Sequence, residues 1–179
     1  MEEKKIEKLN PEVEILNPDQ WEELKDFRLF ALKTDPIAFG ESYDREEKKT
    51  EQEIREKLGD LNYKAYVIKI GDKVRALATC NLYLPGRVTH QAQIHAVFTD
   101  PDYRKQGLGK NLLEKILKDL HQNPITSRVS LSVSTTQEGA IKMYEKAGFK
   151  EFGIGHKELK VDGKYYDLVY MELIFEDKL

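Results

Sequence analysis

Some segments of the chain have β-forming residues or a two-residue apolar period, and others have an apolar period of three to four residues. The change from one pattern to the other marks where one expected element ends and the next begins. Seven segments are rich in β-forming residues, and two of them, at residues 73–84 and 129–133, also alternate apolar and polar positions, which is a pattern of β-strands. We expect these strands at residues 13–16, 63–70, 73–84, 88–99, 129–133, 150–160 and 164–175. In the third segment the alternation predicts a single buried face. Its apolar residues are Val74, Ala76, Ala78, Cys80 and Leu82.

Apolar spacings of three and four residues predict four helices between these strands. We expect them at residues 20–35, 51–58, 108–120 and 136–147. Capping boxes at residues 50–53 and 135–138 are expected to start the second and the fourth helix. Gly59 and Gly148 stand where a helix C-terminus favours a left-handed residue.

The order of these elements is β-α-α-β-β-β-α-β-α-β-β, which predicts one α+β domain whose mixed sheet carries helices on its faces. Asp162-Gly163, between the last two strands, is a strong signal for a two-residue hairpin turn. No repeat, low-complexity tract or linker interrupts the chain. We therefore expect a single domain over residues 1–179, with residues 1–10 as a charged tail.

Composition and charge exclude several functional classes. The chain has 29 Lys and Arg against 32 Asp and Glu, a net charge of −3, whereas nucleic-acid binders that release counterions need clustered positive charge. No apolar run approaches the roughly 18 residues of a membrane span, and the charged start has no secretory signal. One cysteine and four scattered histidines give neither a disulfide nor metal-ligand spacing. We expect a cytoplasmic protein with no metal and no nucleic-acid or membrane partner.

Residues 97–110 carry the most informative chemistry, because they lead from a strand through a polar turn into an amphipathic helix. Gly107 and Gly109 stand at the start of that helix, although glycine costs about 1 kcal/mol relative to alanine in a helix. Glycine lets a ligand touch the backbone there, and the free N–H groups of a first helical turn bind anions. Arg104 and Lys105 add positive charge at the rim, so a ligand that bears phosphate is the leading interpretation.

Two common phosphate-binding motifs do not fit this segment. A Walker A loop needs Ser or Thr after its Gly-Lys pair, and here Asn111 follows Lys110. The dinucleotide-binding fingerprint needs a third glycine where Leu112 stands. A strand-to-helix turn whose two glycines serve only tight packing remains the structural alternative.

The chain resembles the GNAT superfamily of N-acetyltransferases in two motifs. The family's acetyl-CoA loop, Arg/Gln-x-x-Gly-x-Gly/Ala, is matched in full by residues 104–109. A later family motif, Asn-x-x-Ala-x-x-x-Tyr-x-x-x-Gly-Phe, is matched by residues 137–149, with Gln137 in place of the first Asn. The resemblance extends over about residues 60–175 and leaves open whether Gln137 keeps the role of that Asn.

The resemblance implies a central mixed, mostly antiparallel sheet with helices on both faces. It implies that acetyl-CoA lies in a gap between the strands that end at Thr99 and Ser134, with its pyrophosphate on the amides of residues 106–110. A backbone N–H near Val97 would then face the thioester oxygen as an oxyanion donor. The residues that it assigns to the coenzyme are Val97, Phe98, Thr99, Arg104, Lys105, Gln106, Gly107, Leu108, Gly109, Lys110, Gln137, Ala140 and Tyr144.

Two side chains are the catalytic candidates. Tyr144 stands where GNAT enzymes of this pattern protonate the departing thiolate, and a phenol with a pKa of about 10 suits that transfer. The alternative is that its ring only fills a helix face. His95 shares a strand face with Gln93 unless a bulge intervenes, and we take it as the base that receives the proton of the amine. Glu41 or water is the alternative base, and a purely structural histidine fits the pattern equally well.

We expect an N-acetyltransferase that moves the acetyl group of acetyl-CoA to a primary amine by direct attack in a ternary complex. The first two helices and the loop 35–43 are expected to recognise the acceptor, and most of the charge run 44–50 is expected to be a solvated helix start. The acceptor is a small-molecule amine or a protein amino group, and the sequence does not decide between them. A homodimer is compatible with the resemblance. The alternative function is a catalytically inactive coenzyme-A-binding sensor or partner module.

Overall fold

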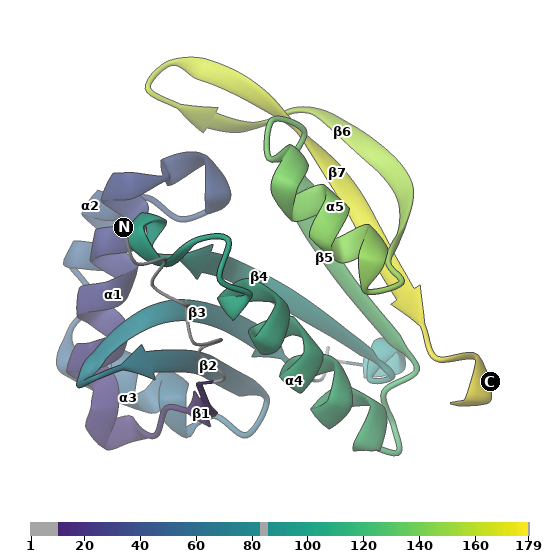
Figure 1. The fold of residues 1–179 in the computed structure, drawn as a ribbon, viewed down its shortest axis with the longest axis horizontal. Helices are drawn as coiled ribbons and strands as arrows, with labels where there is room; N and C mark the ends of the chain where they lie inside the picture. The colour runs from purple at the N-terminus through teal and green to yellow at the C-terminus, as the bar shows by residue number, and fades with distance from the viewer. Residues whose placement is uncertain (1–10, 83–85, 179) are drawn as a thin grey trace, which may run out of the picture.

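The computed structural model describes residues 11–82 and 86–178, so the expected charged tail at residues 1–10 lies outside the described part. Strands of the described residues form one seven-stranded sheet in the order β1-β2-β3-β4-β5-β7-β6 (Figure 1). They are β1 (Val13–Ile15), β2 (Tyr63–Ile70), β3 (Lys73–Asn81), β4 (Gln91–Thr99), β5 (Arg128–Ser134), β6 (Lys150–Val161) and β7 (Lys164–Ile174). All neighbouring strands are antiparallel except β4 and β5, which are parallel. The expected mixed, mostly antiparallel sheet is confirmed.

Helices cover both faces of this sheet (Figure 1). One face carries α1 (Trp21–Thr34), α2 (Tyr43–Glu47) and α3 (Glu51–Gly59), and the other carries α4 (Leu108–Gln122) and α5 (Glu138–Lys146). Each group of helices encloses its own hydrophobic core, which we call the α1-side core and the α4-side core. None of the described helices combines the length and the apolar character needed to cross a membrane.

The inner strand β2 contributes to both cores because its side chains alternate with a period of two. Ala65 and Val67 lie in the α1-side core, whereas Tyr66 and Ile68 lie in the α4-side core, and all four are fully buried. Burial on both faces explains why these strands read as nearly continuous apolar runs.

In β3 the expectation of a single buried face is wrong, because helices cover both sides of it. A bulge also interrupts the alternation that the sequence predicted. Ile68 pairs with Ala76 and Lys69 pairs with Val74, which leaves Arg75 without a partner in the ladder. The extra residue turns Val74 into the α1-side core, whereas Ala76 and the later members of the pattern stay in the α4-side core.

Three predicted local signals are confirmed. Thr50 and Glu53 form a reciprocal capping box at the start of α3. Gly148 has a φ of 98°, and the N–H groups at the end of α5 make the two bonds of a Schellman motif. Asp162 and Gly163 have φ values of 48° and 78°, as a two-residue hairpin turn of type I′ requires.

Two predictions near the helices are wrong. Gly59 lies within α3, and Asp60 is the C-cap. Gln137 rather than Thr135 precedes α5, without a side-chain cap. The charge run at residues 44–50 contributes to α2 and is mostly exposed, as expected, but Glu46 within it is only 2% exposed.

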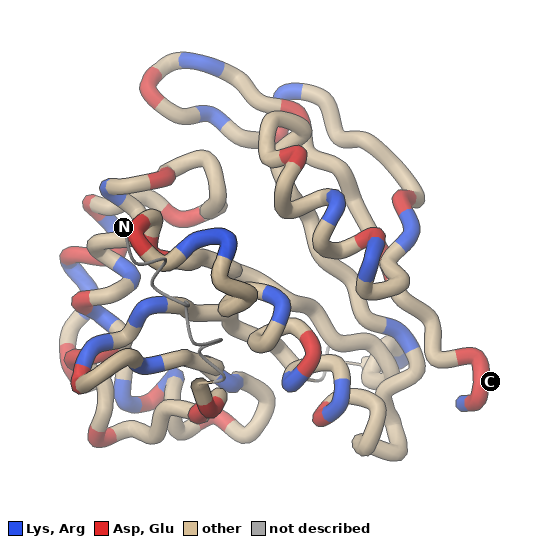
Figure 2. Tube along the Cα trace, in the orientation of Figure 1, with Lys and Arg blue, Asp and Glu red and all other residues tan. Residues whose placement is uncertain are grey.

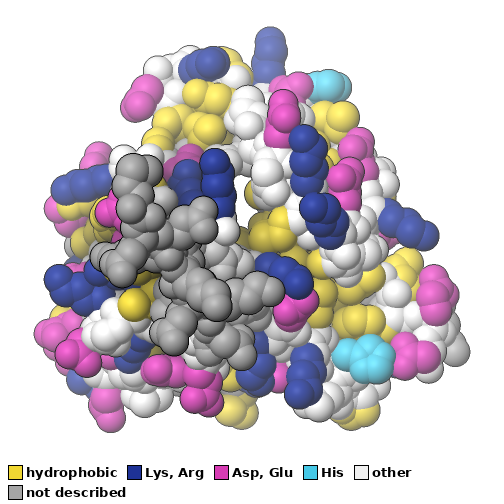
Figure 3. Space-filling view, viewed as in Figure 1, with side chains coloured by type: hydrophobic (Ala, Val, Ile, Leu, Met, Phe, Trp, Pro, Cys, Tyr) yellow, Lys and Arg dark blue, Asp and Glu magenta, His cyan; other side chains and the backbone are white. Residues whose placement is uncertain are grey.

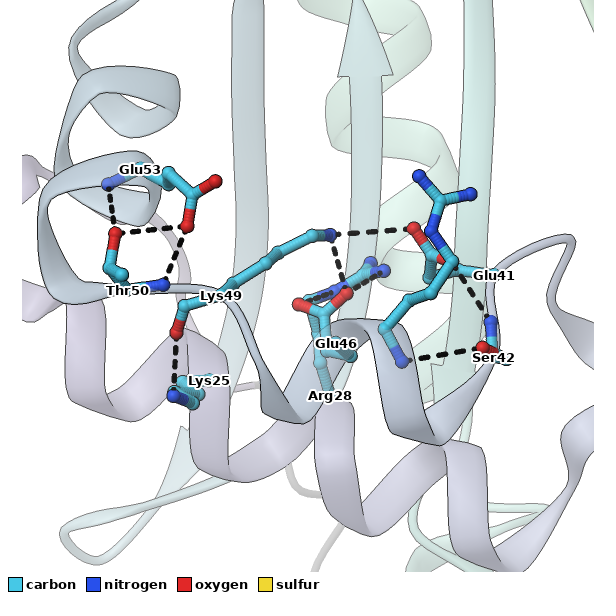
Figure 4. Close-up of polar contacts among 9 residues, drawn as sticks. Lys25, Arg28, Glu41, Ser42, Glu46, Lys49, Thr50 and Glu53 are labelled. Atoms are coloured by element: carbon cyan, nitrogen blue, oxygen red, sulfur yellow. Dashed lines mark hydrogen bonds and ion pairs between the residues drawn. The ribbon is translucent and has the colours of Figure 1, made fainter.

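Glu46 forms a buried ion pair with Arg28, and this pair links α2 to α1 (Figure 4). Arg28 Nε and Nη2 donate to its two carboxylate oxygens at 2.8 and 3.0 Å, and Lys49 Nζ lies 2.7 Å from Oε2. Burial alone would raise the pKa of Glu46, but the hydrogen bonds and charge of Arg28, followed by those of Lys49, hold that pKa below its ordinary value. The folded state therefore favours the ionised carboxylate.

Glu46→Gln should lower the free energy of unfolding by about 3 kcal/mol at pH 7, because it leaves Arg28 without its buried counter-charge. The pKa of Glu46 is lower in the folded state than in the unfolded state. Ionised Glu46 therefore contributes its full stabilisation above the unfolded-state pKa, and this contribution is lost as the pH falls through the folded-state pKa. The difference between wild type and variant in urea denaturation should therefore shrink below about pH 4.

Glu47→Gln is the matched control, since it removes the same charge from an exposed position on α2. It should change stability by no more than about 0.5 kcal/mol. A Glu46→Gln protein as stable as this control would contradict the role of the ion pair.

Candidate functional site

A cleft opens in the sheet because β4 and β5 pair over three residues only and then diverge. Residues 91–93 pair with 128–130, and no pair joins these strands beyond that point. The gap holds a cleft of about 450 Å³, lined by both strands, the loop before α4, and α5. Figure 3 shows the surface hollowed between the two halves of the molecule. The gap expected between the strands that end at Thr99 and Ser134 is therefore present.

A bulge in β4 exposes main chain along one wall of this cleft. Phe98 pairs with Leu77 and His95 with Thr79, so two residues of β4, Ala96 and Val97, lie opposite one residue of β3. Ala96 has a φ of 52°, which is unusual for a residue other than glycine. Neither bulged residue has a ladder partner in β3 or β5, so this stretch of main chain lies at the wall of the cleft outside the regular pairing of the sheet.

The same bulge reverses the direction of the side chains along β4. Ile94 and Val97 pack on the α4-side core, whereas Ala96 and Phe98 pack on the α1-side core. His95 therefore lies next to Ala96 on the α1 side, and it does not share a face with Val97 as an uninterrupted strand would require. The bulge follows His95, so the pairing from Gln93 to His95 is regular and these two residues share a face, as the sequence predicted.

The loop before α4 presents a concave row of unpaired amides to the cleft. Lys105 and Gly107 both have positive φ, at 61° and 88°, which turns successive N–H groups toward one side. Among the described backbone bonds, none uses an N–H of residues 105–110, and the first helical bond runs from Asn111 N to Gly107 O at 2.9 Å. No side chain caps this helix end. The site has the donors that a phosphate group needs.

Positive charge surrounds this row of amides (Figure 2). Arg104, Lys105 and Lys110 line the cleft, and Asp35 is the one acidic residue among the described residues that line it. In the described part of the chain, no group of three His, Cys, Asp or Glu side chains is arranged to hold a metal ion. The electrostatics favour an anionic ligand.

Tyr144 lies in the wall formed by α5 and is 5% exposed. Its ring packs edge-on against Phe149, with centroids 5.9 Å apart. Its hydroxyl makes no hydrogen bond to a described residue, and burial raises the pKa of this phenol above its ordinary value. Tyr144 is thus protonated throughout the neutral range and can act as a hydrogen-bond or proton donor.

His95 lines the cleft from the β4 side and is half-buried. Burial, followed by the positive charges of Lys57 and Arg28, lowers its pKa below the ordinary 6.5. Its Nε2 lies 3.2 Å from Asn81 Nδ2, so Nε2 accepts a hydrogen bond and Nδ1 carries the proton with the amide in this orientation. Rotation of the Asn81 amide would free Nδ1 to accept a proton.

Glu41, the alternative base, lies outside this cleft. Its carboxylate accepts from the Ser42 N–H at 3.0 Å and lies 3.6 Å from both Arg45 Nε and Lys49 Nζ (Figure 4). These contacts occupy its carboxylate oxygens. The structure therefore brings His95, and not Glu41, to the predicted site.

Most of the residues expected to bind the coenzyme line the cleft. They are Val97, Phe98, Thr99, Arg104, Lys105, Gly107, Gly109, Lys110, Gln137, Ala140 and Tyr144. Phe98 contributes only main chain, because its ring is buried among Phe27, Phe30 and Phe39. Leu108 is 1% exposed in the α4-side core, and Gln106 Nε2 donates to the Asp102 carbonyl oxygen, so neither side chain belongs to the cleft lining.

Sequence reasoning missed several residues of the cleft. Asp35 and Ala38 reach it from the segment between α1 and α2, Ser132 from β5 and Met143 from α5. The loop that begins at Asp35 was expected to face only the acceptor. Its position beside the coenzyme residues depends on contacts across the sheet, for which the local sequence carries no signal.

The chain is similar to known proteins in sequence and in fold. Residues 17–149 match the sequence profile of the acetyltransferase (GNAT) family. The ribosomal protein bS18-alanine N-acetyltransferase of Escherichia coli (strain K12) is 31% identical over 86 residues, which are 48% of this chain and 57% of that protein. The N-alpha-acetyltransferase RimI of Mycobacterium tuberculosis is 30% identical over 71 residues, which are 40% of this chain and 42% of that protein. The chain thus matches about half the length of these relatives.

Solved structures share the fold at lower identity. An acetyltransferase of the GNAT family from Streptococcus pneumoniae has a TM-score of 0.81 at 21% identity, covering 92% of this chain and 99% of that one. NAA60 of Arabidopsis thaliana, solved in complex with acetyl-CoA, has a TM-score of 0.71 at 14% identity, covering 91% and 97%.

We expect the His95 imidazole to titrate below pH 6.5 in an NMR pH titration, because burial and two nearby cations disfavour its charged form. Lys57→Met should raise this midpoint by removing one of the cations. Lys118→Met, at an exposed position on α4, is the matched control and should leave it unchanged. A midpoint at or above 6.5 in the wild type would refute this description of the site.

Proposed function

Since the chain belongs to the acetyltransferase (GNAT) family, we propose that it transfers the acetyl group of acetyl-CoA to a primary amino group in the cleft between β4 and β5. The observation that carries this proposal is the presence, in one cleft, of two sets of unpaired main-chain groups. One set is the bulge at Ala96 and Val97, and the other is the row of amides at residues 105–110. The first suits an extended amide-bearing arm, and the second suits a pyrophosphate.

These residues fit acetyl-CoA, whose thioester supplies the activated acetyl group when it is bound. The amides of residues 105–110, with Arg104 and Lys110, would hold the phosphates. The main chain of Ala96 and Val97 would hold the pantetheine arm and direct an N–H at the thioester oxygen. A fixed N–H at that position stabilises the negative charge that develops when an amine attacks the carbonyl carbon.

We propose that the amine attacks the thioester directly, without an acetylated enzyme. Cys80 is the only cysteine of the chain and lies in the α4-side core, where burial raises its pKa to about 12. A thiol that is fully buried and protonated is not a nucleophile at neutral pH. Direct attack requires both substrates in the cleft together, which is a ternary complex.

Tyr144 is the proposed donor to the departing coenzyme thiolate. Its raised pKa keeps the phenol neutral until the carbon–sulfur bond lengthens, and a neutral phenol stabilises the growing negative charge on sulfur by hydrogen bonding. The proton moves to sulfur as the thiolate leaves. The resulting phenolate recovers a proton from solvent after the product departs.

The lowered pKa of His95 favours an α-amino group as the acceptor. A lysine side chain has a pKa of about 10.4, and its deprotonation at pH 7 costs roughly 4 to 5 kcal/mol, whereas an α-amine with a pKa of about 8 costs roughly 1 kcal/mol. An imidazole with a lowered pKa is a weak base, so it accepts the proton of an α-amine more readily than the proton of a lysine side chain. The names of the two relatives, which refer to a ribosomal protein alanine and to N-alpha-acetylation, support a protein N-terminus as the acceptor.

A coenzyme A release assay with three acceptors tests this function. We expect rapid release with a peptide whose N-terminus is free, and much slower release with an N-terminally blocked, lysine-containing peptide and with a linear polyamine. Preference for the polyamine would contradict the proposed acceptor class. Binding of acetyl-CoA without release for any acceptor would favour the inactive coenzyme-binding module.

Gly109→Val should weaken acetyl-CoA binding about tenfold or more. The family motif has glycine or alanine at this position and no larger residue. A Cβ alone would lie 3.4 Å from Met143 Sδ and 3.5 Å from Thr99 Oγ1, so the further methyl groups of valine would crowd the cleft beside the amide row. Gly109 does not have a positive φ, so its backbone conformation accepts a side chain. Calorimetry measures the affinity, and Gly59→Val in α3 is the control that should leave it unchanged. Equal affinities in all three proteins would exclude the amide row as the phosphate site.

Tyr144→Phe should keep acetyl-CoA affinity and the melting temperature, because the ring contact with Phe149 remains. Turnover should fall by roughly 10² to 10⁴, the usual cost of losing a general acid. A decrease of less than about threefold in steady-state turnover would remove Tyr144 from the mechanism and leave water as the proton donor.

A further inference from the structure

Asp35 makes a side-chain contact across the open end of the cleft. It follows α1 on the acceptor side of the molecule, and its Oδ1 and Oδ2 lie 3.0 and 3.1 Å from Nε2 of Gln137, which precedes α5. Arg104 Nη2 lies 3.5 Å from Oδ2. The Asp35 side chain is 18% exposed, so this contact is shielded from most of the solvent.

The chemistry of this contact fixes the orientation of the Gln137 carboxamide. An ionised carboxylate only accepts hydrogen bonds, so the NH₂ group of Gln137 must face Asp35. Because the amide is planar, its oxygen then points away from the carboxylate, and no described residue donates to that oxygen. Gln137 lines the cleft, and its Oε1 is thus presented as an acceptor for a ligand N–H.

The Asp35 carboxylate is not used as a local cap, although Asp35 precedes the short 3-10 helix Pro36–Ala38 as its N-cap residue. Asp35 is also the C-cap of α1, where the helix dipole is negative and a cation would be favoured. Its own N–H bonds Ala31 O at 2.9 Å, and the next residues form a turn that buries Phe39 in the α1-side core. The carboxylate is therefore held rigidly in place, and its described side-chain partners are Gln137 and Arg104.

We propose that Asp35 is a positioning residue that turns the Gln137 carboxamide oxygen toward the cleft, where it accepts a hydrogen bond from an amide N–H of the pantetheine arm. This inference rests on the proposed use of acetyl-CoA. The longer side chain of Gln137, compared with the asparagine of the family motif, reaches Asp35 and is fixed by it. The contact also joins the acceptor-side loop 35–42 to the coenzyme-side helix α5.

Simple electrostatics predicts the opposite effect of removing Asp35, which makes the test decisive. Acetyl-CoA is an anion, so loss of a carboxylate near Arg104 would by itself tighten binding. We expect instead that Asp35→Ala weakens acetyl-CoA binding about five- to tenfold in calorimetry, the value of one oriented hydrogen bond. Asp26→Ala, an exposed position on the same helix, is the charge-matched control and should stay within about twofold of wild type.

The probe that separates positioning from general damage is 3′-phosphoadenosine 5′-diphosphate, which carries the phosphates of the coenzyme without the pantetheine arm. The Asp35→Ala variant should bind this probe at least as tightly as the wild type does. Such binding also shows that the variant is folded. Gln137→Met should lose the same factor for acetyl-CoA. The double variant should be no weaker than either single variant, because Asp35 acts only through Gln137.

Three results would overturn the inference. They are unchanged or tighter acetyl-CoA binding by Asp35→Ala, additive losses in the double variant, and equal weakening of both ligands, which would place Asp35 in support of the phosphate loop. Unchanged acetyl-CoA affinity in Gln137→Met would overturn it independently, should Asp35→Ala fail to fold. Wild-type protein that binds neither ligand would refute the proposed function itself, which distinguishes the two failures.

Discussion

The three-residue pairing of β4 with β5 is the constraint on which the rest of the site depends. Backbone N–H and C=O groups in a protein interior need partners, and a strand that loses its neighbour leaves a row of them unpaired. The ladder stops after residues 93 and 130, so both facing edges are left to bind something other than each other. The amide row before α4, Tyr144 on α5 and the loop at Asp35 all converge on that gap. The cleft is thus a direct result of how the strands of the sheet pair.

The bulge in β4 is stable because two separate cores hold its flanks. A left-handed φ at Ala96 costs roughly 1 kcal/mol. Ile94 on one side and Phe98 on the other are 2% and 3% exposed, and they pack into opposite cores. Straightening the strand would exchange the faces of its side chains and remove one of these residues from its core. Burial of large apolar side chains therefore maintains the unpaired main chain that the site uses.

The sequence predicts those features of the fold that neighbouring residues determine. The capping box at Thr50, the Schellman motif at Gly148 and the two glycines at the start of α4 each depend on a few adjacent residues, and each can be predicted directly from the sequence. Features set by distant residues were missed. Glu46 is buried in an ion pair with Arg28, which lies 18 positions away in the sequence. Gln137 is oriented by Asp35, which lies 102 positions away.

The β4 bulge belongs to the same group of missed features. Alanine carries no bulge signal, and the register is set by pairing with β3. The cleft lining was predicted well where backbone chemistry defines it. It was predicted less well where side chains meet across the sheet, as at Asp35 and His95.

A cleft that binds its ligand mainly through main chain has a consequence for how such proteins diverge. Every residue except proline offers the same N–H, so most positions along the bulge and the amide row can change without altering the donors that they present. The acceptor-side segments pack on their own core, on the opposite face of the sheet from α4 and α5. Mutations that reshape the loop between α1 and α2 can therefore accumulate while the coenzyme side keeps working. Asp35 is an exception, because a substitution there would change both the loop between α1 and α2 and the orientation of Gln137 on the coenzyme side. Partial independence of this kind makes one scaffold evolvable toward many acceptors.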